Sequence, residues 1–217
     1  MTVEAQNAVH WSAEFSRVIS CERCDAATCK KLLRDVKENV PQPGFIGARY
    51  WEHRIVLVGQ NPGITRAPTA SDDRRYTEAL RRVRDEPSEA TWESLRAITR
   101  EFIPRWPVHG NHFPLKESGL TLDQIAYFNI VRCRTIENAP PSARMVELCR
   151  DHLDRWLDLL RPRGVIFIGK WASVRGEPSV KAHGALSAFM NRERSLSSAD
   201  RMENRRSVVE FVRRLAS

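Results

Sequence analysis

The sequence predicts an α/β fold in which a parallel sheet carries helices on both faces. Short, continuous apolar runs alternate along the chain with longer stretches of helical periodicity. Runs of this length are typical of strands buried on both faces, and their alternation with helices is typical of βαβ units. With 217 residues, the chain suits a single domain over 1–217.

Four runs are predicted to be strands. Three of them are HRIVLVG at 53–59, IAYFNIV at 125–131 and the start of GVIFIGKWA at 164–172, and a short fourth is SVKAH at 179–183. In such folds the functional site lies beyond the carboxyl ends of the strands. The polar groups expected to meet there are Gly59, Gln60, Asn61, Asn129, Gly169, Lys170 and His183. Their convergence predicts an active site at this edge.

The remaining periodic stretches are predicted to be helices. An N-terminal helical segment covers about 11–40, and a charged helical insertion covers about 66–105. Ser71 precedes two acidic residues and is a plausible helix N-cap. Two more helices are expected at 140–162 and 204–215. The sequence contains no internal repeat and no low-complexity linker.

The charge balance favours a polyanionic partner. The chain has 35 Lys and Arg residues against 27 Asp and Glu, a net charge of +8. Nucleic acid is a common partner of such proteins, although a basic surface is often only solvated. No apolar run approaches the length that spans a bilayer, and residues 1–15 lack the features of a signal peptide. We therefore expect a cytoplasmic protein with reduced cysteines.

The cysteines suggest a metal site. Cys21 and Cys24 form a CxxC pair with Cys29 nearby, and Cys133 and Cys149 form a second pair far along the chain. Four thiolates suit an iron–sulfur cluster or a zinc ion. The alternative is that Cys149 is simply buried on an apolar helix face and that Cys29 is incidental.

Taken together, the motifs resemble those of the uracil-DNA glycosylase superfamily, and most closely its iron–sulfur branches, families 4 and 5. The matching stretches are CERC (21–24), VGQNPG (58–63), FNIVRCRT (128–135), Cys149, VIFIGKWA (165–172) and AHGALS (182–187). The resemblance implies a three-layer α/β/α sandwich with a short four-stranded parallel sheet. It also implies a [4Fe–4S] cluster on Cys21, Cys24, Cys133 and Cys149, and a monomer that acts on DNA.

The resemblance further implies a monofunctional DNA glycosylase, which hydrolyses the N-glycosidic bond of uracil or a related flipped pyrimidine. In the family, the loop after the first strand positions the attacking water. The iron–sulfur branches typically have an acid at its second position, where this chain has Gln60, and Asn61 gives it a GINPG-like loop. An amide orients water but is a poor base. The other interpretation is that Asn61 only caps the turn.

Further residues take roles from the same resemblance. Asn129 matches the residue that reads the base edge, although a reversed amide would suit cytosine as well as uracil. His183 matches the histidine that stabilises the departing base anion. Leu186 is a candidate wedge for the vacated base position. The expected phosphate contacts are Arg132, Arg134, Lys170 and Lys181.

Two departures from the family leave the target base open. The stretch that supplies the stacking aromatic is absent, so Tyr76 or Phe113 would have to stack. Gly63 stands where strict uracil enzymes have a tyrosine that blocks a 5-methyl group. A modified or mismatched pyrimidine, for example in foreign (phage) DNA, is therefore an alternative substrate. Two functions of a different kind also stay open: a catalytically weak iron–sulfur DNA-binding module, and a zinc protein without glycosylase activity.

Overall fold

The computed structural model describes residues 12–25, 27–33, 39–63, 70–102, 113–192 and 196–216. The chain divides into two compact units. Unit 1 comprises Met1–Pro43, Asn61–Arg100 and Val131–His152. Unit 2 comprises Gly44–Gln60, Glu101–Ile130 and Leu153–Ser217. All five cysteines belong to unit 1, whereas every strand of the sheet belongs to unit 2.

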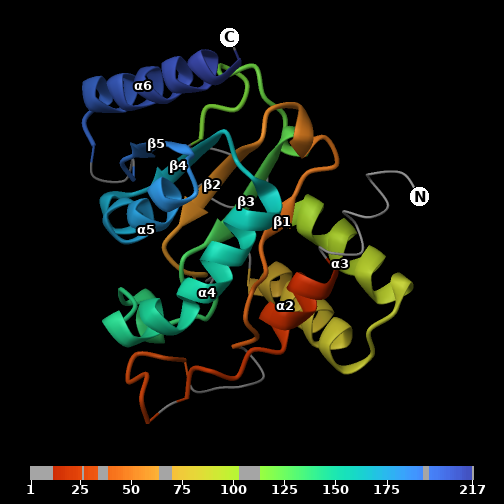
Figure 1. The fold of residues 1–217 in the computed structure, drawn as a ribbon. Coiled ribbons are helices and arrows are strands. Elements are labelled where there is room, and N and C mark those ends of the chain that lie inside the picture. Colours follow the sequence, from red (N-terminus) through yellow and green to blue (C-terminus); the bar gives the residue numbers. More distant parts are fainter. Residues whose placement is uncertain are drawn as a thin grey trace. The chain divides into compact units, whose positions relative to one another are not determined.

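The sheet of unit 2 has five strands in the order β1-β3-β2-β4-β5 (Figure 1). They are β1 (Phe45–Ile46), β2 (Ile55–Gly59), β3 (Ile125–Asn129), β4 (Gly164–Ile168) and β5 (Leu186–Met190). β2 to β5 are mutually parallel, and the two-residue β1 pairs antiparallel with β3. The predicted four-stranded parallel sheet is confirmed, with β1 as an added edge strand.

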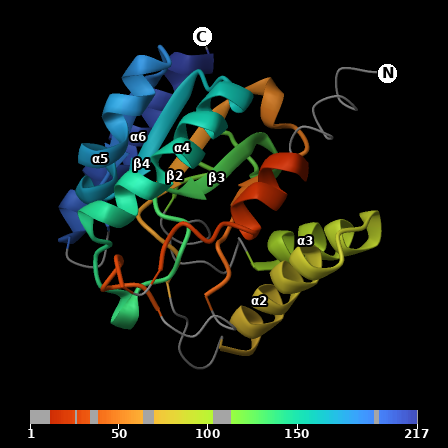
Figure 2. The same cartoon turned by 60° about the horizontal axis from the view of Figure 1, so that its bottom comes forward.

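Helices cover both faces of this sheet, which confirms the α/β/α layering. α6 (Ser198–Ala216) packs Val208, Phe211 and Val212 on the face that contains Leu57. On the other face, Phe128 of β3 stacks on Trp156, with ring centroids 6.1 Å apart. α5 (Lys170–Ala182) packs on that face as well. Figure 1 shows α6 above and α5 below β4, and Figure 2 shows the same elements turned by 60°.

The predicted fourth strand at 179–183 is wrong. These residues end α5, and β5 follows at Leu186–Met190. Within α5 the buried positions are Ala172, Gly176 and Val180, one helical turn apart. Their small size lets the helix approach the sheet, since a Cβ on Gly176 would lie 2.4 Å from the Phe167 ring. Small residues give a weak helical signal, and Val180 beside Lys181 imitated the alternation of a strand.

Unit 1 is largely helical. Residues 12–19 are helical, followed by α2 (Ala70–Asp85), α3 (Glu89–Phe102) and the first part of α4 (Ala143–Leu160). The helices expected within 66–105 are confirmed. The helix expected over 11–40 is not, because the described residues between 20 and 33 form turns and coil. Asp25 fixes one such turn by accepting hydrogen bonds from the N–H groups of Ala27 and Thr28.

Three short 3₁₀ helices complete the described structure: Tyr50–Glu52, Leu122–Gln124 and Ile136–Asn138. No helix among the described residues has both the length and the apolar character that a membrane crossing requires. The prediction of one domain over 1–217 stays a prediction.

Candidate functional site

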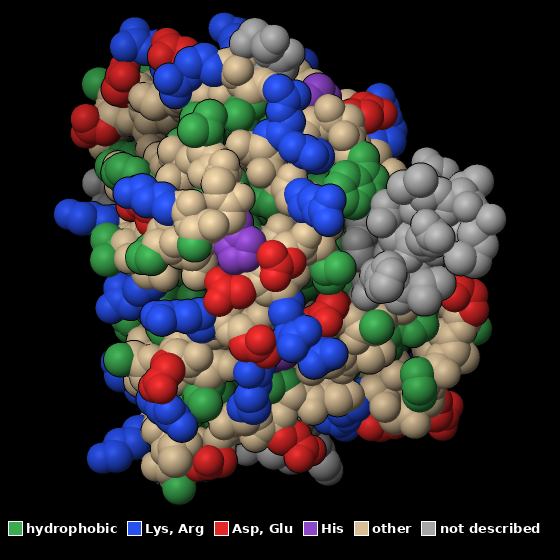
Figure 3. Space-filling model, in the orientation of Figure 1, with side chains coloured by type: hydrophobic (Ala, Val, Ile, Leu, Met, Phe, Trp, Pro, Cys, Tyr) green, Lys and Arg blue, Asp and Glu red, His purple; other side chains and the backbone are tan. Residues whose placement is uncertain are grey.

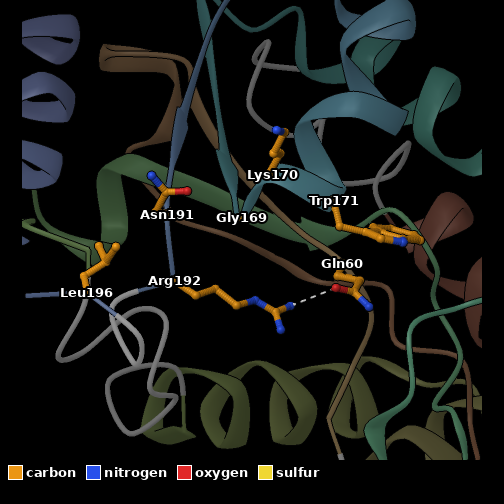
Figure 4. A pocket seen from close by; sticks show the side chains of 7 residues that line it. All are labelled: Gln60, Gly169, Lys170, Trp171, Asn191, Arg192 and Leu196. Carbon is orange, nitrogen blue, oxygen red and sulfur yellow. Dashed lines mark hydrogen bonds between the residues drawn. The ribbon is translucent and has the colours of Figure 1, made fainter. Parts of the chain in front are cut away.

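The carboxyl ends of the parallel strands form one edge of the unit 2 sheet. Gly59 of β2 pairs with Asn129 of β3, and Ile168 of β4 pairs with Met190 of β5. A cavity of about 230 Å³ lies here (Figure 4). The residues that line it are Gln60, Gly169, Lys170, Trp171, Asn191, Arg192 and Leu196. This volume is below the roughly 300–1,000 Å³ that drug-sized ligands occupy, so it suits a group as small as one base or one phosphate.

Arg192 reaches across this cavity to Gln60 (Figure 4). Its Nη2 donates a hydrogen bond to Gln60 Oε1 at 3.2 Å. Gln60 is only 8% exposed, whereas Arg192 is exposed. A side chain of the loop after β5 therefore fixes a buried amide at the end of β2.

The cavity is lined by two cations. Neither Lys170 nor Arg192 forms an ion pair with a carboxylate among the described residues, and both side chains are exposed. On the face shown in Figure 3, Lys and Arg side chains are interspersed with Asp and Glu rather than gathered in one field. The uncompensated charge at the cavity favours an anionic ligand.

Trp171 is a half-buried aromatic side chain in the lining. The Arg175 guanidinium lies 4.4 Å from the centroid of its ring. Such a contact favours a fixed orientation of the indole.

Asn129 is buried at the same edge, with 5% exposure. Its Oδ1 accepts a hydrogen bond from the Tyr127 hydroxyl at 2.8 Å. A Cβ on Gly59 would lie 2.3 Å from this oxygen, so only glycine fits beside it. Gly59 thereby lets the Asn129 amide lie against the end of β2.

His183 lies at the opposite edge of the sheet from the one predicted. It is the C-cap of α5 and precedes β5, whose first residue pairs with the first residue of β4. Five-residue strands separate the two edges by roughly 13 Å. Its Nδ1 lies 2.7 Å from Ser179 O and its Nε2 lies 3.2 Å from Asp158 Oδ1. Both ring nitrogens thus have local partners.

Leu186 and Lys181 share this amino edge, so neither has the position that its predicted role assumed. Leu186 is the first residue of β5 and is 62% exposed. Lys181 is in the last turn of α5 and pairs with Glu177 at 3.1 Å. Lys170 alone of the four predicted phosphate contacts is exposed at the carboxyl edge.

Asn61 belongs to unit 1, where its amide has two acceptors. Nδ2 donates to Pro62 O and to Thr135 Oγ1, each at 3.1 Å. The Thr135 hydroxyl in turn donates to Ala139 O at 2.6 Å. A carbonyl can only accept, so Nδ2 must face Pro62 and Oδ1 faces away. Asn61 caps its turn and also presents an oriented acceptor.

Of the other predicted substrate contacts, Gly63 has open space around it, whereas Tyr76 and Phe113 are buried. A Cβ on Gly63 would meet nothing closer than Asn138 Oδ1 at 3.6 Å, so the position has room. Tyr76 in α2 is 2% exposed and Phe113 is 3% exposed. Phe113 packs in the core with Leu57. Neither ring can stack on a base in this arrangement, which corrects that prediction.

Arg132 and Arg134 are buried rather than available to DNA, with exposures of 1% and 3%. Arg132 donates from Nη1 to Pro43 O at 3.0 Å. Arg134 forms a salt bridge with Asp73 of α2. Their prediction as phosphate contacts is therefore wrong for this arrangement, and both stabilise unit 1 from within.

Three of the predicted ligand thiols lie together in unit 1. The Cys24 thiol forms hydrogen bonds with those of Cys133 and Cys149. The hydrogen bond that Cys24 donates to Cys133 is the largest cause that raises the pKa of Cys24. The hydrogen bond with Cys24, followed by burial, likewise raises the pKa of Cys149. Burial and their mutual contacts favour the protonated thiols, so these side chains would become thiolates only with a cation bound beside them.

The fourth cysteine lies beside a cation. Arg23 Nε is 3.5 Å from Cys21 Sγ, and Arg23 also pairs with Asp151 at 3.3 Å. Cys29 is fully buried. Within the described residues, no group of three His, Cys, Asp or Glu side chains has the arrangement of a formed metal site. The donor type thus fits an iron–sulfur cluster or zinc, and the arrangement is not that of a bound ion.

The sheet and its polar carboxyl edge define an α/β protein with a small cavity lined by two cations. The profile of the uracil DNA glycosylase superfamily matches residues 49–209. The chain belongs to this superfamily. It is 33% identical over 153 residues to the type-4 uracil-DNA glycosylase of Sulfurisphaera tokodaii, which is 70% of this chain and 51% of that protein.

A second relative is the type-4 uracil-DNA glycosylase of Archaeoglobus fulgidus. The identity is 32% over 59 residues, which is 27% of this chain and 30% of that protein. The chain thus matches about half, or less, of the length of these relatives.

The sequence interpretation missed four residues of the cavity: Trp171, Asn191, Arg192 and Leu196. Asn191 and Arg192 follow β5, which was itself missed. Trp171 stands in the GKWA stretch, directly after Lys170. Its place after a predicted strand was a signal that could have identified it.

Proposed function

We propose that this protein is a monofunctional DNA glycosylase, which hydrolyses the N-glycosidic bond of uracil or a related flipped pyrimidine as a step of base excision. The carboxyl edge of the sheet supports this most directly. There the buried Gln60 lines the cavity with the exposed cations Lys170 and Arg192, and the buried Asn129 ends the neighbouring strand β3. Amides suit a base edge, and cations suit the phosphates of a polyanion.

Asn61 is proposed to hold the attacking water. Its Nδ2 is occupied by Pro62 O and Thr135 Oγ1, so Oδ1 is the atom that remains for a ligand. An acceptor of this kind orients a water molecule by accepting a hydrogen bond from it. It does not remove that proton, because an amide is a poor base.

The departing base needs stabilisation as an anion, because negative charge builds on it while the sugar becomes cationic. His183 lies at the other edge of the sheet, so the proposal gives this role to the positive charge of Arg192, while Lys170 is proposed to contact a phosphate. Fixed charge at the position where charge develops is commonly worth a large rate factor. Trp171 is the aromatic proposed to stack on the base.

A [4Fe–4S] cluster on Cys21, Cys24, Cys133 and Cys149 is proposed as a structural element of unit 1. The contact of Cys24 with Cys133 and Cys149 supports this proposal. Such a cluster would join the N-terminal coil to the loop after β3 and to α4. No step of base removal requires it.

Gly63 favours a second candidate substrate class. The open space around it would admit a 5-methyl or larger 5-substituent on the pyrimidine. The alternative is therefore a glycosylase that removes a modified or mismatched pyrimidine, for example from phage DNA.

The test is a panel of duplexes that differ in one pyrimidine. The pure protein, in molar excess, is incubated with each duplex, and alkali then breaks the strand at any abasic site. Breaks at uracil alone would support the first candidate, and breaks at a 5-substituted pyrimidine the second. Tight binding without breaks on any duplex would identify a catalytically weak DNA-binding module instead.

Asn61→Ala and Lys170→Met serve as paired variants in this assay. Asn61→Ala should slow single-turnover base release while DNA binding is kept. Lys170→Met should weaken binding to every duplex alike, because a phosphate contact carries no sequence information. Equal release rates for Asn61→Ala and the wild type would exclude Asn61 from catalysis.

A further inference from the structure

Gln60 has an amide whose orientation is dictated by its partner. Arg192 Nη2 donates to Gln60 Oε1 at 3.2 Å, and a guanidinium can only donate. The oxygen must therefore face Arg192, and the Nε2 group must face the other way (Figure 4). Among the described residues, Gln60 Nε2 makes no hydrogen bond. The cavity thus has a buried side chain with an N–H donor left for a ligand.

We propose that Arg192 is a positioning residue, which holds the Gln60 amide so that it offers only N–H donors and thereby selects a pyrimidine with a carbonyl over one with an amino group at the contacted edge. This inference rests on the proposed function. It supplies the discrimination between uracil or thymine and cytosine. A donor that meets an amino group is left unpaired in a buried site, which costs affinity.

Two contacts hold Arg192 in place. Asn204 of α6 clamps the backbone of Asn191, accepting from its N–H at 2.8 Å and donating to its carbonyl at 3.1 Å. The stem of Arg192 then passes over Gly169, where a Cβ would lie 3.5 Å from the Arg192 Cγ and Nε. Gly169 has a φ of +92°, which favours glycine. Asn204 thus fixes the backbone next to Arg192, and Gly169 leaves room for the Arg192 side chain to extend toward Gln60.

Asn129 has no comparable restriction. Its partner among the described residues is the Tyr127 hydroxyl, which can donate to Oδ1 or accept from Nδ2. Its amide can therefore turn over to suit either type of base edge. Discrimination by an amide at this edge of unit 2 thus depends on Gln60, whose partner cannot change roles.

The experiment measures a ratio of dissociation constants for uncleavable duplexes. The target nucleotide is 2′-fluorinated deoxyuridine or 2′-fluorinated deoxycytidine, since the fluorine disfavours positive charge on the sugar and so prevents cleavage. The ratio cancels general electrostatic effects on DNA binding. Uracil release from an ordinary duplex by the wild type is measured in parallel.

Three variants of Arg192 change what Gln60 can bind. Arg192→Lys keeps a donor-only partner and should retain the wild-type preference for uracil, expected to be about 10-fold or more. Arg192→Met removes the hydrogen bond to Gln60 Oε1, so the Gln60 amide can turn over and the ratio of the two dissociation constants should fall toward one. Arg192→Glu supplies an acceptor that attracts Nε2, which turns Oε1 to the ligand, so the ratio should invert in favour of cytosine.

Lys170→Met is the matched control, because it removes a cation of the same cavity that has no hydrogen bond to Gln60. It should weaken binding to both duplexes and leave the ratio unchanged. The same loss of preference in Lys170→Met and Arg192→Met would overturn the inference, since charge alone would then explain it. So would an unchanged ratio in Arg192→Met and Arg192→Glu while the wild type releases uracil. Absence of base release by the wild type would overturn the proposed function together with this inference.

Discussion

Asn61→Asp is the substitution whose outcome the structure determines in most detail. From the sequence alone, an acid at this position adds a general base, and cleavage of uracil should be as fast or faster. The structure adds a cost. Nδ2 of Asn61 donates to Pro62 O and Thr135 Oγ1, and the hydroxyl of Thr135 is already used on Ala139 O. In Asn61→Asp, a carboxylate oxygen would replace Nδ2 and would face Pro62 O at about the same 3.1 Å, with no proton between them.

The size of the cost follows from those contacts. Two hydrogen bonds of a half-buried group are lost, each worth about 0.5–1.5 kcal/mol, so the free energy of unfolding should fall by about 1–3 kcal/mol. A protonated carboxyl could still donate to Pro62 O, so the fold should raise the pKa of the new acid. Between its unfolded and folded pKa values the folded state then binds more protons, and stability decreases as the pH rises. The deficit is largest above the folded pKa.

The assay has two parts. Urea unfolding of wild type and Asn61→Asp is compared at mildly acidic and mildly basic pH, and single-turnover uracil release is measured over the same range. Asn138→Asp is the control, because it makes the same change at an exposed position of unit 1. We expect release by Asn61→Asp to increase with pH as its stability falls. Equal stability of wild type and Asn61→Asp at every pH would refute the reasoning, since the amide would then have no need of its acceptors.

Three further predictions test the other assignments. Anaerobically purified protein should contain iron and absorb visible light as thiolate-bound iron–sulfur centres do, and Cys149→Ala should lose both; stoichiometric zinc without iron would contradict the cluster. Lys170→Met should reduce the slope of log affinity against log salt by about 0.9 for one lost phosphate contact, whereas Lys181→Met, at the other edge, should leave it unchanged. His183→Ala should keep the single-turnover rate and lower only stability, through loss of its contact with Asp158; a large fall in rate would restore His183 to catalysis.

The predictability of the sheet depended on burial. β2, β3 and β4 are buried at all five positions, so they are continuous apolar runs in the sequence. β5 is an edge strand, and Leu186 and Phe189 within it are exposed. A run of mixed burial has no clear period, whereas residues 179–183 alternate polar and apolar side chains as a half-buried strand does. Because 179–183 was predicted to be a strand that ends at His183, His183 was predicted at the carboxyl edge, whereas it lies at the amino edge.

The site was predictable only where a predicted strand ended. Gln60, Asn129 and Lys170 were found because they follow β2, end β3 and follow β4. Arg192 was not found, because its strand was missed and its partner Gln60 is 132 residues away. The burial of Arg134 was equally out of reach, because arginine is normally exposed and Asp73 neutralises it from a distant helix.

The contacts of Asn61 in the loop after β2 favour an amide over an acid at this position. Asn61 has two acceptors arranged around its Nδ2, and one of them, Pro62 O, belongs to the loop backbone and cannot change roles. An acid at position 61 would leave Pro62 O without a donor, whereas an amide donates to both partners and still presents Oδ1. Gln60, one residue earlier, is held the opposite way by Arg192 and presents Nε2. On the proposed function, one amide orients the water and the other reads the base. The rate then depends on stabilisation of the departing base by charge rather than on removal of a proton from water.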